Sequence, residues 1–177
     1  LQEVMQLARQ GEGLHAEFKK KATHPEKIVR EIIALANTRG GYLFIGVDDD
    51  GTVSGQRYIE EEVYVMDKAI SELVFPPLGF SRTIIPLNPK RGVAVYKIDR
   101  SDSRPHFLFE DKKKKAYVRV EDRSIQASRE VWEILKRQKE DALEYIVDQY
   151  LPLVKGISKK ILAPIESQGL IEECIND

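Results

Sequence analysis

The chain has 177 residues, 42% of them apolar and 32% charged, which is typical of a soluble globular domain, alone or with an appendage. Its 28 lysines and arginines are balanced by 29 aspartates and glutamates, which excludes a polycationic, histone-like protein. The single cysteine, Cys174, excludes a disulfide framework within the chain and a cysteine-rich zinc site. No apolar run reaches the roughly 18 residues of a membrane span, and the first residues show no signal-peptide pattern. We therefore expect a cytoplasmic protein without a membrane partner.

Hydrophobic residues at helical spacing predict four helices before residue 136. In chain order, the predicted ranges are 1–10, 23–39, 59–73 and 128–135. The second helix should begin at a capping box formed by Thr23 and Glu26 and end at Gly40-Gly41, and Ser128 should cap the fourth. Residues 136–141 include no apolar side chain, so we expect a domain over 1–135 and a helical C-terminal extension over 136–177.

Short apolar runs bounded by turn residues predict strands between these helices. The predicted strands are a brief extended segment at 15–18, then 42–47, 52–53, 80–87, 92–99, 107–109 and 116–120. Because strands alternate with helices and some strands are joined by hairpins, the expected fold class is mixed α/β (α+β). A mixed sheet with helices packed on it should form its centre.

Carboxylates from separate segments are the first candidates for chemistry. Glu12 and Glu17 flank a short extended segment, and the run Asp48-Asp49-Asp50 follows the central strand. Hard oxygen ligands in such an arrangement are what a divalent-metal nuclease needs. In the alternative interpretation, the three aspartates form a solvated turn and Glu17 pairs with a nearby lysine.

Two lysine runs are the second candidates, because lysines can follow a phosphate backbone. They span residues 19–21 and 112–115, and both can equally be solvated strand ends or turns. Glu110 and Asp111 partly cancel the charge of the second run. Asn37 and Thr38, at a predicted helix end, can satisfy free carbonyls or contact a phosphate. Trp132 is expected in the core rather than as a base-stacking platform, since Val131 and Leu135 accompany it.

Several segments, taken in their order along the chain, resemble the Schlafen-type AlbA-2 domain. They are GEGLHAEFK at 11–19, ALANTRGG at 34–41, FIGVDDDG at 44–51, RPH at 104–106 and YVRV at 117–120, followed by Ser124, Ala127 and Ser128. Each motif is weak alone, whereas the ordered set is specific and covers about residues 1–135.

The resemblance implies a nucleic-acid-binding domain of mixed α/β fold. In bacteria such domains occur in transcriptional regulators, which are frequently described as ATP-binding. In vertebrate Schlafens the domain cleaves structured RNA with two glutamates and an aspartate around a divalent metal. Those positions match Glu12, Glu17 and Asp49 here. The vertebrate enzymes use two fused copies of the domain, whereas this chain has one.

Two functions therefore compete, and we predict the first. The first is binding of nucleic acid, with a preference for DNA, to the phosphate backbone with low sequence specificity and without a cofactor. Its predicted contacts are Lys19, Lys20, Lys21, Arg39, Arg119 and Arg123. The second is a Schlafen-type endoribonuclease that uses Glu12, Glu17 and Asp49 with Mg²⁺ or Mn²⁺. We also expect a homodimer through the C-terminal helices.

Overall fold

The fold is α+β, as predicted, and the computed structural model describes residues 1–137, 148, 150 and 151 of the chain. The helices of this part are α1 (Gln2–Gln10), α2 (Pro25–Asn37), α3 (Ile59–Leu73) and α4 (Arg129–Lys136). The strands are β1 (Ala16–Lys19), β2 (Gly41–Ile45), β3 (Val74–Phe75), β4 (Phe80–Asn88), β5 (Arg91–Ile98), β6 (Phe107–Glu110), β7 (Lys113–Lys115), β8 (Tyr117–Val120) and β9 (Arg123–Gln126). None of these helices is long and apolar enough to cross a membrane.

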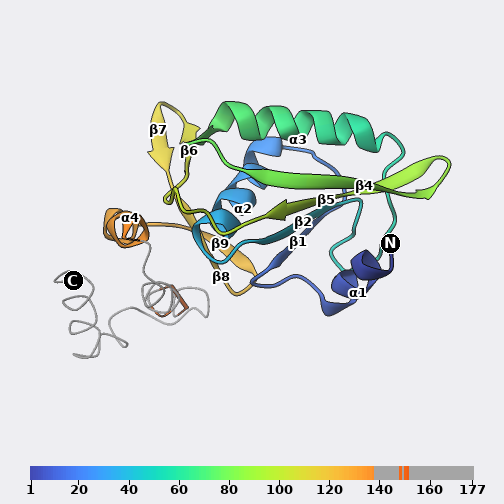
Figure 1. The fold of residues 1–177 in the computed structure, drawn as a ribbon, viewed down its shortest axis with the longest axis horizontal. Coiled ribbons are helices and arrows are strands. Elements are labelled where there is room, and N and C mark those ends of the chain that lie inside the picture. Colours follow the sequence, from blue (N-terminus) through green and yellow to red (C-terminus); the bar gives the residue numbers. More distant parts are fainter. Residues whose placement is uncertain (138–147, 149, 152–177) are drawn as a thin grey trace.

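A four-stranded mixed sheet, with strands in the order β1-β2-β5-β4, forms the centre of the molecule (Figure 1). β1 and β2 are parallel and are joined through α2, whereas β5 is antiparallel to both β2 and β4. The remaining strands of the described part form a three-stranded sheet, β3-β6-β7, and a β8–β9 hairpin. The predicted mixed sheet is therefore confirmed.

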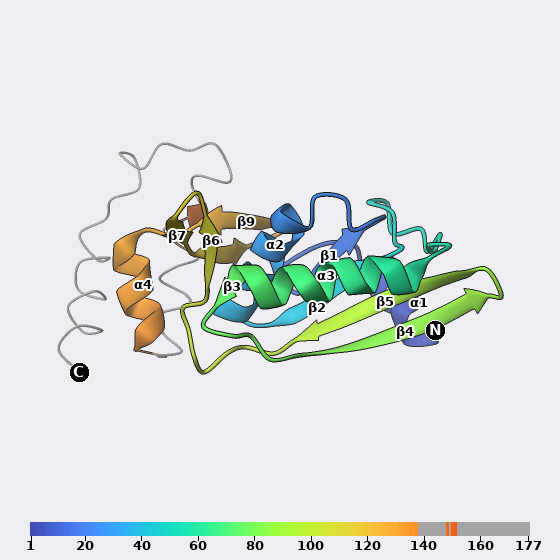
Figure 2. The same cartoon turned by 90° about the horizontal axis from the view of Figure 1, so that it is seen from above.

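The two faces of the central sheet carry separate cores, because successive strand side chains point to opposite sides. Leu43 and Ile45 of β2 pack in the cluster that includes α2 and α3, while Phe44 between them packs with Val4 of α1. Figure 2 shows α3 running along β4 and β5, with the β6–β7 hairpin at its C-terminal end. The alternation of this short strand thus places helices on both faces of the sheet.

Helix α2 is buried between the central sheet and the β8–β9 hairpin, and its last residues join these parts. The Asn37 side-chain amide donates to the backbone oxygens of His106 (3.1 Å) and Tyr117 (3.0 Å) and accepts from the His106 N–H (2.8 Å). Thr38 Oγ1 donates to the Ala34 carbonyl (2.7 Å) and accepts from the Arg119 N–H (2.8 Å). Both residues are buried, so their role is to satisfy backbone groups rather than to contact a phosphate.

The helix ends confirm one predicted cap and correct another. Gly40 adopts φ 73°, where a Cβ would lie 2.6 Å from the Ile98 carbonyl oxygen, so this turn from α2 into β2 requires glycine. Ser128 Oγ accepts from the Val131 N–H (3.4 Å) and caps α4, as predicted. The predicted Thr23–Glu26 capping box is wrong, because α2 begins at Pro25 after a left-handed His24 and has no side-chain cap.

A third core lies between α4 and the β8–β9 hairpin. It includes Val118, Val131 and Leu135, and the partly buried Trp132 packs against it, as the sequence predicted. Tyr150 is also buried there, and its hydroxyl accepts from the Ser128 N–H (2.9 Å). Most of the predicted extension at 136–177, including the expected dimer contacts, lies outside the described residues.

Candidate nucleic-acid interface

Arg119 of β8 is completely buried and links three segments that are distant in the sequence. Its guanidinium donates to the carboxylates of Glu17 (2.6 Å) and Glu31 (2.9 Å). It also donates to the backbone oxygens of Gly13 (3.0 Å) and Ala16 (3.2 Å). The predicted phosphate contact at Arg119 is therefore wrong, because a guanidinium without exposed surface and with this many partners is a structural cross-link.

Glu17 of β1 is held from two sides by cations. One carboxylate oxygen accepts from Arg119, and the other accepts from the Lys19 ammonium. Burial alone would lower the pKa of Lys19, but its contact with Glu17 and the nearby charges of Glu31 and Glu12 raise it overall. Lys19 is therefore a firmly charged partner of Glu17, as the alternative interpretation of these residues predicted, rather than a free phosphate contact.

The carboxylates predicted to bind a metal lie near one another but are not arranged as ligands. Burial raises the pKa of Glu12, and the charges of Glu17 and Asp49 raise it further, against a hydrogen bond from the Phe18 N–H (2.8 Å). Both oxygens of Glu17 already accept from cations. In the described part of the chain, no group of three or more His, Cys, Asp or Glu residues could hold a metal ion. These residues do not fit Mg²⁺ or Mn²⁺, and we derive no cleavage step from them.

The rest of the first lysine run is only partly available for a ligand. Lys20 is exposed but lies 3.4 Å from an Asp48 carboxylate oxygen. Lys21 is exposed and makes no ion pair with the described residues. Asp49 and Asp50 are exposed in the turn after Asp48. Acidic side chains therefore offset most of the positive charge on this face.

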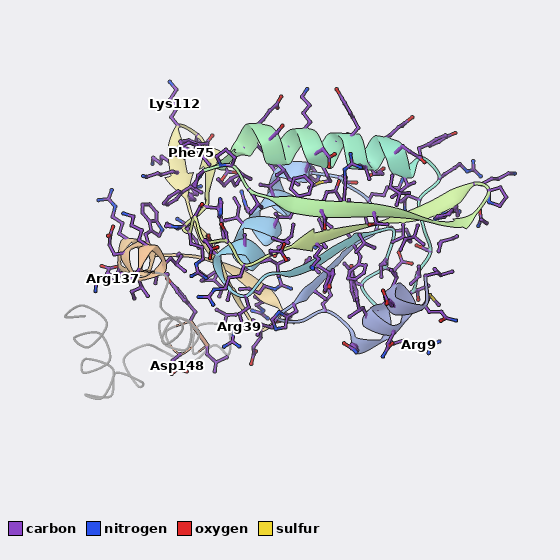
Figure 3. All side chains as sticks on the ribbon, viewed as in Figure 1. Arg9, Arg39, Phe75, Lys112, Arg137 and Asp148 are labelled. Carbon is purple, nitrogen blue, oxygen red and sulfur yellow. The ribbon has the colours of Figure 1, made fainter. Side chains whose placement is uncertain are left out.

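The two predicted arginines that remain lie on the surface. Arg39 directly follows Thr38, whose hydroxyl binds the backbone of β8, and Figure 3 shows Arg39 at the edge of the molecule near that strand. Arg123 begins β9 and is also exposed. Neither side chain has an ion pair with a described residue. Together with Lys21, they are the predicted phosphate contacts that are exposed and make no ion pair with the described residues.

The second lysine run forms the tip and return strand of the β6–β7 hairpin. Lys115 pairs with Glu110 (3.1 Å), which also binds Arg30 (2.6 Å). These two hydrogen bonds lower the pKa of Glu110, so its carboxylate stays ionised and two cations offset its negative charge. Lys112 and Lys113 are exposed and, within the described part, make no ion pair. The charge of this run is therefore much less balanced than that of the first.

Aromatic rings lie beside this hairpin, and sequence reasoning missed their role on the surface. The rings of Phe75 (58% exposed) and Phe109 (47% exposed) meet edge to face, with centroids 6.0 Å apart. Lys114 Nζ lies 4.7 Å from the centroid of the Phe107 ring and 5.7 Å from that of Trp132. The run Phe107-Leu108-Phe109 gave no sufficient signal, because Phe107 and Phe109 share one face of the strand and yet only Phe109 is exposed.

Comparison with known proteins places this architecture in a family. The family model described as Schlafen, AlbA_2 matches residues 12–128, a range that includes the Arg119 cluster and both lysine runs. No curated protein matches the chain. A similar solved structure is the N-terminal domain of a protein from Nitrosomonas europaea that is named as ATP-dependent DNA helicase RecG-related. The TM-score is 0.53 at 16% identity, over 72% of this chain and 90% of that one, so the two share a fold. The chain belongs to the Schlafen AlbA_2 domain family.

Proposed function

We propose that this domain binds nucleic acid through the phosphate backbone, with low sequence specificity. Membership of the Schlafen AlbA_2 family supports the proposal, as does a fold shared with a domain of a protein named for a DNA helicase. One observation carries it. Three consecutive exposed lysines, Lys112, Lys113 and Lys114, stand on a hairpin whose Glu110 is already neutralised by Arg30 and Lys115.

The chemistry of this hairpin favours backbone contacts over base reading. Each lysine ammonium is a point charge on a flexible stem and lacks the planar fork with which arginine recognises a guanine edge. Such contacts neutralise phosphates and release counterions, which gives affinity but little sequence information. Lys21, Arg39 and Arg123 can add further contacts of the same kind. A preference for DNA and a role in transcriptional regulation stay predictions.

The proposal is tested by fluorescence anisotropy with labelled duplex DNA and duplex RNA over a salt range of about 50 to 200 mM. The variant K112Q/K113Q/K114Q removes the hairpin charge but keeps long side chains. For each phosphate that the variant no longer neutralises, the slope of log affinity against log salt should fall by about 0.9 on duplex DNA. We expect affinity to decrease similarly on unrelated sequences.

The matched control is K20Q/K21Q, which removes charge from the face where acidic residues surround the lysines. It should weaken binding less than the hairpin variant does. Affinity that does not depend on salt, or no binding by the wild-type chain at the lowest salt, would contradict the proposed function. Equal weakening in the two variants would assign the contacts to both faces and contradict the primacy of the hairpin.

A further inference from the structure

One face of the β3-β6-β7 sheet combines exposed rings with lysine charge. Residues directly opposite each other in an antiparallel pair point to the same side, and the pairs here are Phe75 with Phe107 and Phe109 with Lys114. These four side chains therefore share one face, which we call the aromatic–lysine face. Figure 3 shows Phe75 at the base of the hairpin and Lys112 projecting from its tip.

The exposed phenylalanines of this chain are gathered on this face. Among its six phenylalanines, Phe75 and Phe109 are the two with large exposure, and they lie in contact with each other. Single exposed apolar residues need no explanation, but an adjacent pair of exposed rings loses the free energy that burial would give both. Their burial in a complex would recover it.

We infer that the aromatic–lysine face is a stacking platform for unpaired bases, so that single-stranded nucleic acid is a ligand of this domain. The inference rests on the proposed function and names its ligand class. Phe75 and Phe109 would each offer a ring to a base, while Lys112 and Lys114 contact the flanking phosphates. Bases in a duplex are already stacked on each other, so exposed rings gain free energy from unpaired bases.

The turn at the tip of the hairpin supports a ligand-binding role for Lys112. Asp111 and Lys112 have φ of 51° and 59°, the conformation of a two-residue turn in which both central residues are left-handed. Asp-Gly is the sequence that such a turn prefers, yet this chain has a lysine at the second position. A β-carbon in this conformation costs free energy, and such strain is typical of functional positions.

The charge of the face argues against an ordinary protein-docking surface. The hairpin tip carries three exposed lysines against one exposed acid, Asp111, and Lys114 already lies over the aromatic surface. A strand of nucleic acid satisfies both features at once, because its phosphates and bases alternate along its length. An apolar protein partner would instead leave the lysines facing a surface without charge.

The experiment compares three labelled probes of equal length, each about 15 nucleotides: oligothymidine, a matched duplex and an abasic strand with phosphates but no bases. The variant F75L/F109L keeps apolar bulk on the face but removes both rings. We expect it to bind oligothymidine at least about fivefold more weakly, the factor that corresponds to 1 kcal/mol of stacking. Its affinity for the duplex and the abasic strand should stay within about twofold of wild type.

Two further variants separate stacking from charge and from folding. F109W keeps a ring, so it should retain oligothymidine binding, and the strand should quench its indole fluorescence. K112Q/K113Q/K114Q should weaken binding to all three probes. Circular dichroism and thermal melting of each variant show whether the fold is kept, and F109W supports the inference even if F75L/F109L fails to fold.

The outcomes distinguish the inference from the function on which it rests. If F75L/F109L binds oligothymidine normally while the lysine variant does not, the platform is wrong and phosphate binding stands. An equal loss of affinity on the abasic strand also overturns the platform, because the rings would then only support the hairpin. A change of oligomeric state with normal binding would assign the face to a protein contact instead. If the wild-type chain binds none of the probes, both proposals fail.

Discussion

The two lysine runs of this domain are similar in sequence and opposite in their surroundings. In the run at 19–21, Lys19 is held by the buried Glu17, and Lys20 lies beside Asp48. In the run at 112–115, Lys115 alone has a carboxylate partner in the described part, and Arg30 already neutralises that partner, Glu110. The same residue type therefore stabilises the fold in one place and leaves charge for a ligand in the other.

The difference teaches that the acids around a lysine run decide its role. The strand pairing of β1 with β2 brings Lys19 and Lys20 next to the acidic turn that follows β2. Figure 1 shows the β6–β7 hairpin at the outer edge of the molecule, and Lys112 and Lys113 at and beside its tip have no carboxylate partner among the described residues. The second run has only one lysine more than the first. Its greater unpaired charge comes from the fold, which places fewer carboxylates beside it.

The largest effect on stability is expected from replacing Arg119, whose buried ion pairs hold the region around the first lysine run together. Replacing Arg119 with alanine removes the fully buried member of its ion pairs with Glu17 and Glu31 and leaves Lys19 as the remaining cation on the buried Glu17 carboxylate. Removing one member of a buried ion pair typically costs about 3–5 kcal/mol. We therefore expect the free energy of unfolding, measured by chemical denaturation, to fall by about that amount.

Arg119→Lys is the control, because it keeps the charge but loses the fork that reaches Glu17 and Glu31 together. It should be intermediate in stability. Folded protein of either variant should bind nucleic acid as wild type does. Normal stability with weakened binding would return Arg119 to the phosphate contacts.

A smaller effect, of opposite sign for stability and binding, is expected at the hairpin tip. Lys112→Gly relieves the left-handed strain and gives the turn its preferred Asp-Gly sequence, so stability should rise by about 1 kcal/mol. Affinity for nucleic acid should fall, because one exposed charge is removed. Thermal melting and anisotropy measure the two quantities on one sample. A variant that gains stability and keeps its affinity would show that Lys112 contacts no ligand.

Much of this fold was predictable from local sequence patterns. The exceptions are strands that are very short or that form only because a partner strand pairs with them. The four helices follow from spacing, and the strands of the central sheet follow from apolar runs between turns. Strand β9 was missed because it holds a single apolar residue, Ile125, and the predicted strand at 52–53 is wrong, because Val53 makes only an isolated bridge with Val47. The strands β3 and β7 were also missed, because Val74-Phe75 is only two residues long and Lys113–Lys115 has no apolar residue. Both pair with β6, so the partner strand rather than their own sequence makes them strands.

The candidate site was less predictable, because burial of a charge depends on partners distant in the sequence. Arg119 lies 102 residues from Glu17 and 88 from Glu31. Tyr117, two residues before Arg119 in the run Tyr-Val-Arg-Val, was a hint that Arg119 lies inside, because the two side chains share one face of β8 and Tyr117 belongs to the core around α2. Nothing local indicated which carboxylates would meet it. Glu12, Glu17 and Asp49 lie close enough for the charges of the latter two to act on Glu12, but they form no metal-ligand set in the described part of the chain.

Acid titration should separate the two regions further. Burial and the charge of Glu17 raise the pKa of Glu31 above 4.5, whereas hydrogen bonds from Lys115 and Arg30 lower the pKa of Glu110 below it. The folded state therefore holds the Glu31 proton more tightly than the unfolded chain does, so this group lowers stability as pH rises from 4.5 through its folded pKa. Glu110 has the reverse sign, and its contribution is lost as pH falls from 4.5 through its folded pKa.

Carboxyl NMR titration measures the two groups directly, and Glu31→Gln should remove the first slope from a plot of unfolding free energy against pH. The control Glu110→Gln should instead remove the decrease at the acid end. Identical titration midpoints for Glu31 and Glu110 would contradict the contrast between a crowded acidic face and a neutralised hairpin.

The smallest expected effect is on affinity, and it tests whether the acidic residues near the first lysine run prevent it from binding nucleic acid. Asp48→Asn removes the carboxylate beside Lys20 but keeps a side chain of the same shape. Exposed ion pairs contribute little, so the free energy of unfolding should change by less than about 1 kcal/mol. Lys20 would then face the solvent without its partner, and the affinity for duplex DNA at low salt should rise. Because the gain is electrostatic, it should vanish at high salt, and K20Q/D48N should show none of it. An Asp48→Asn variant with unchanged affinity would mean that this face makes no contact with nucleic acid, which would leave binding to the hairpin and to cations elsewhere on the surface.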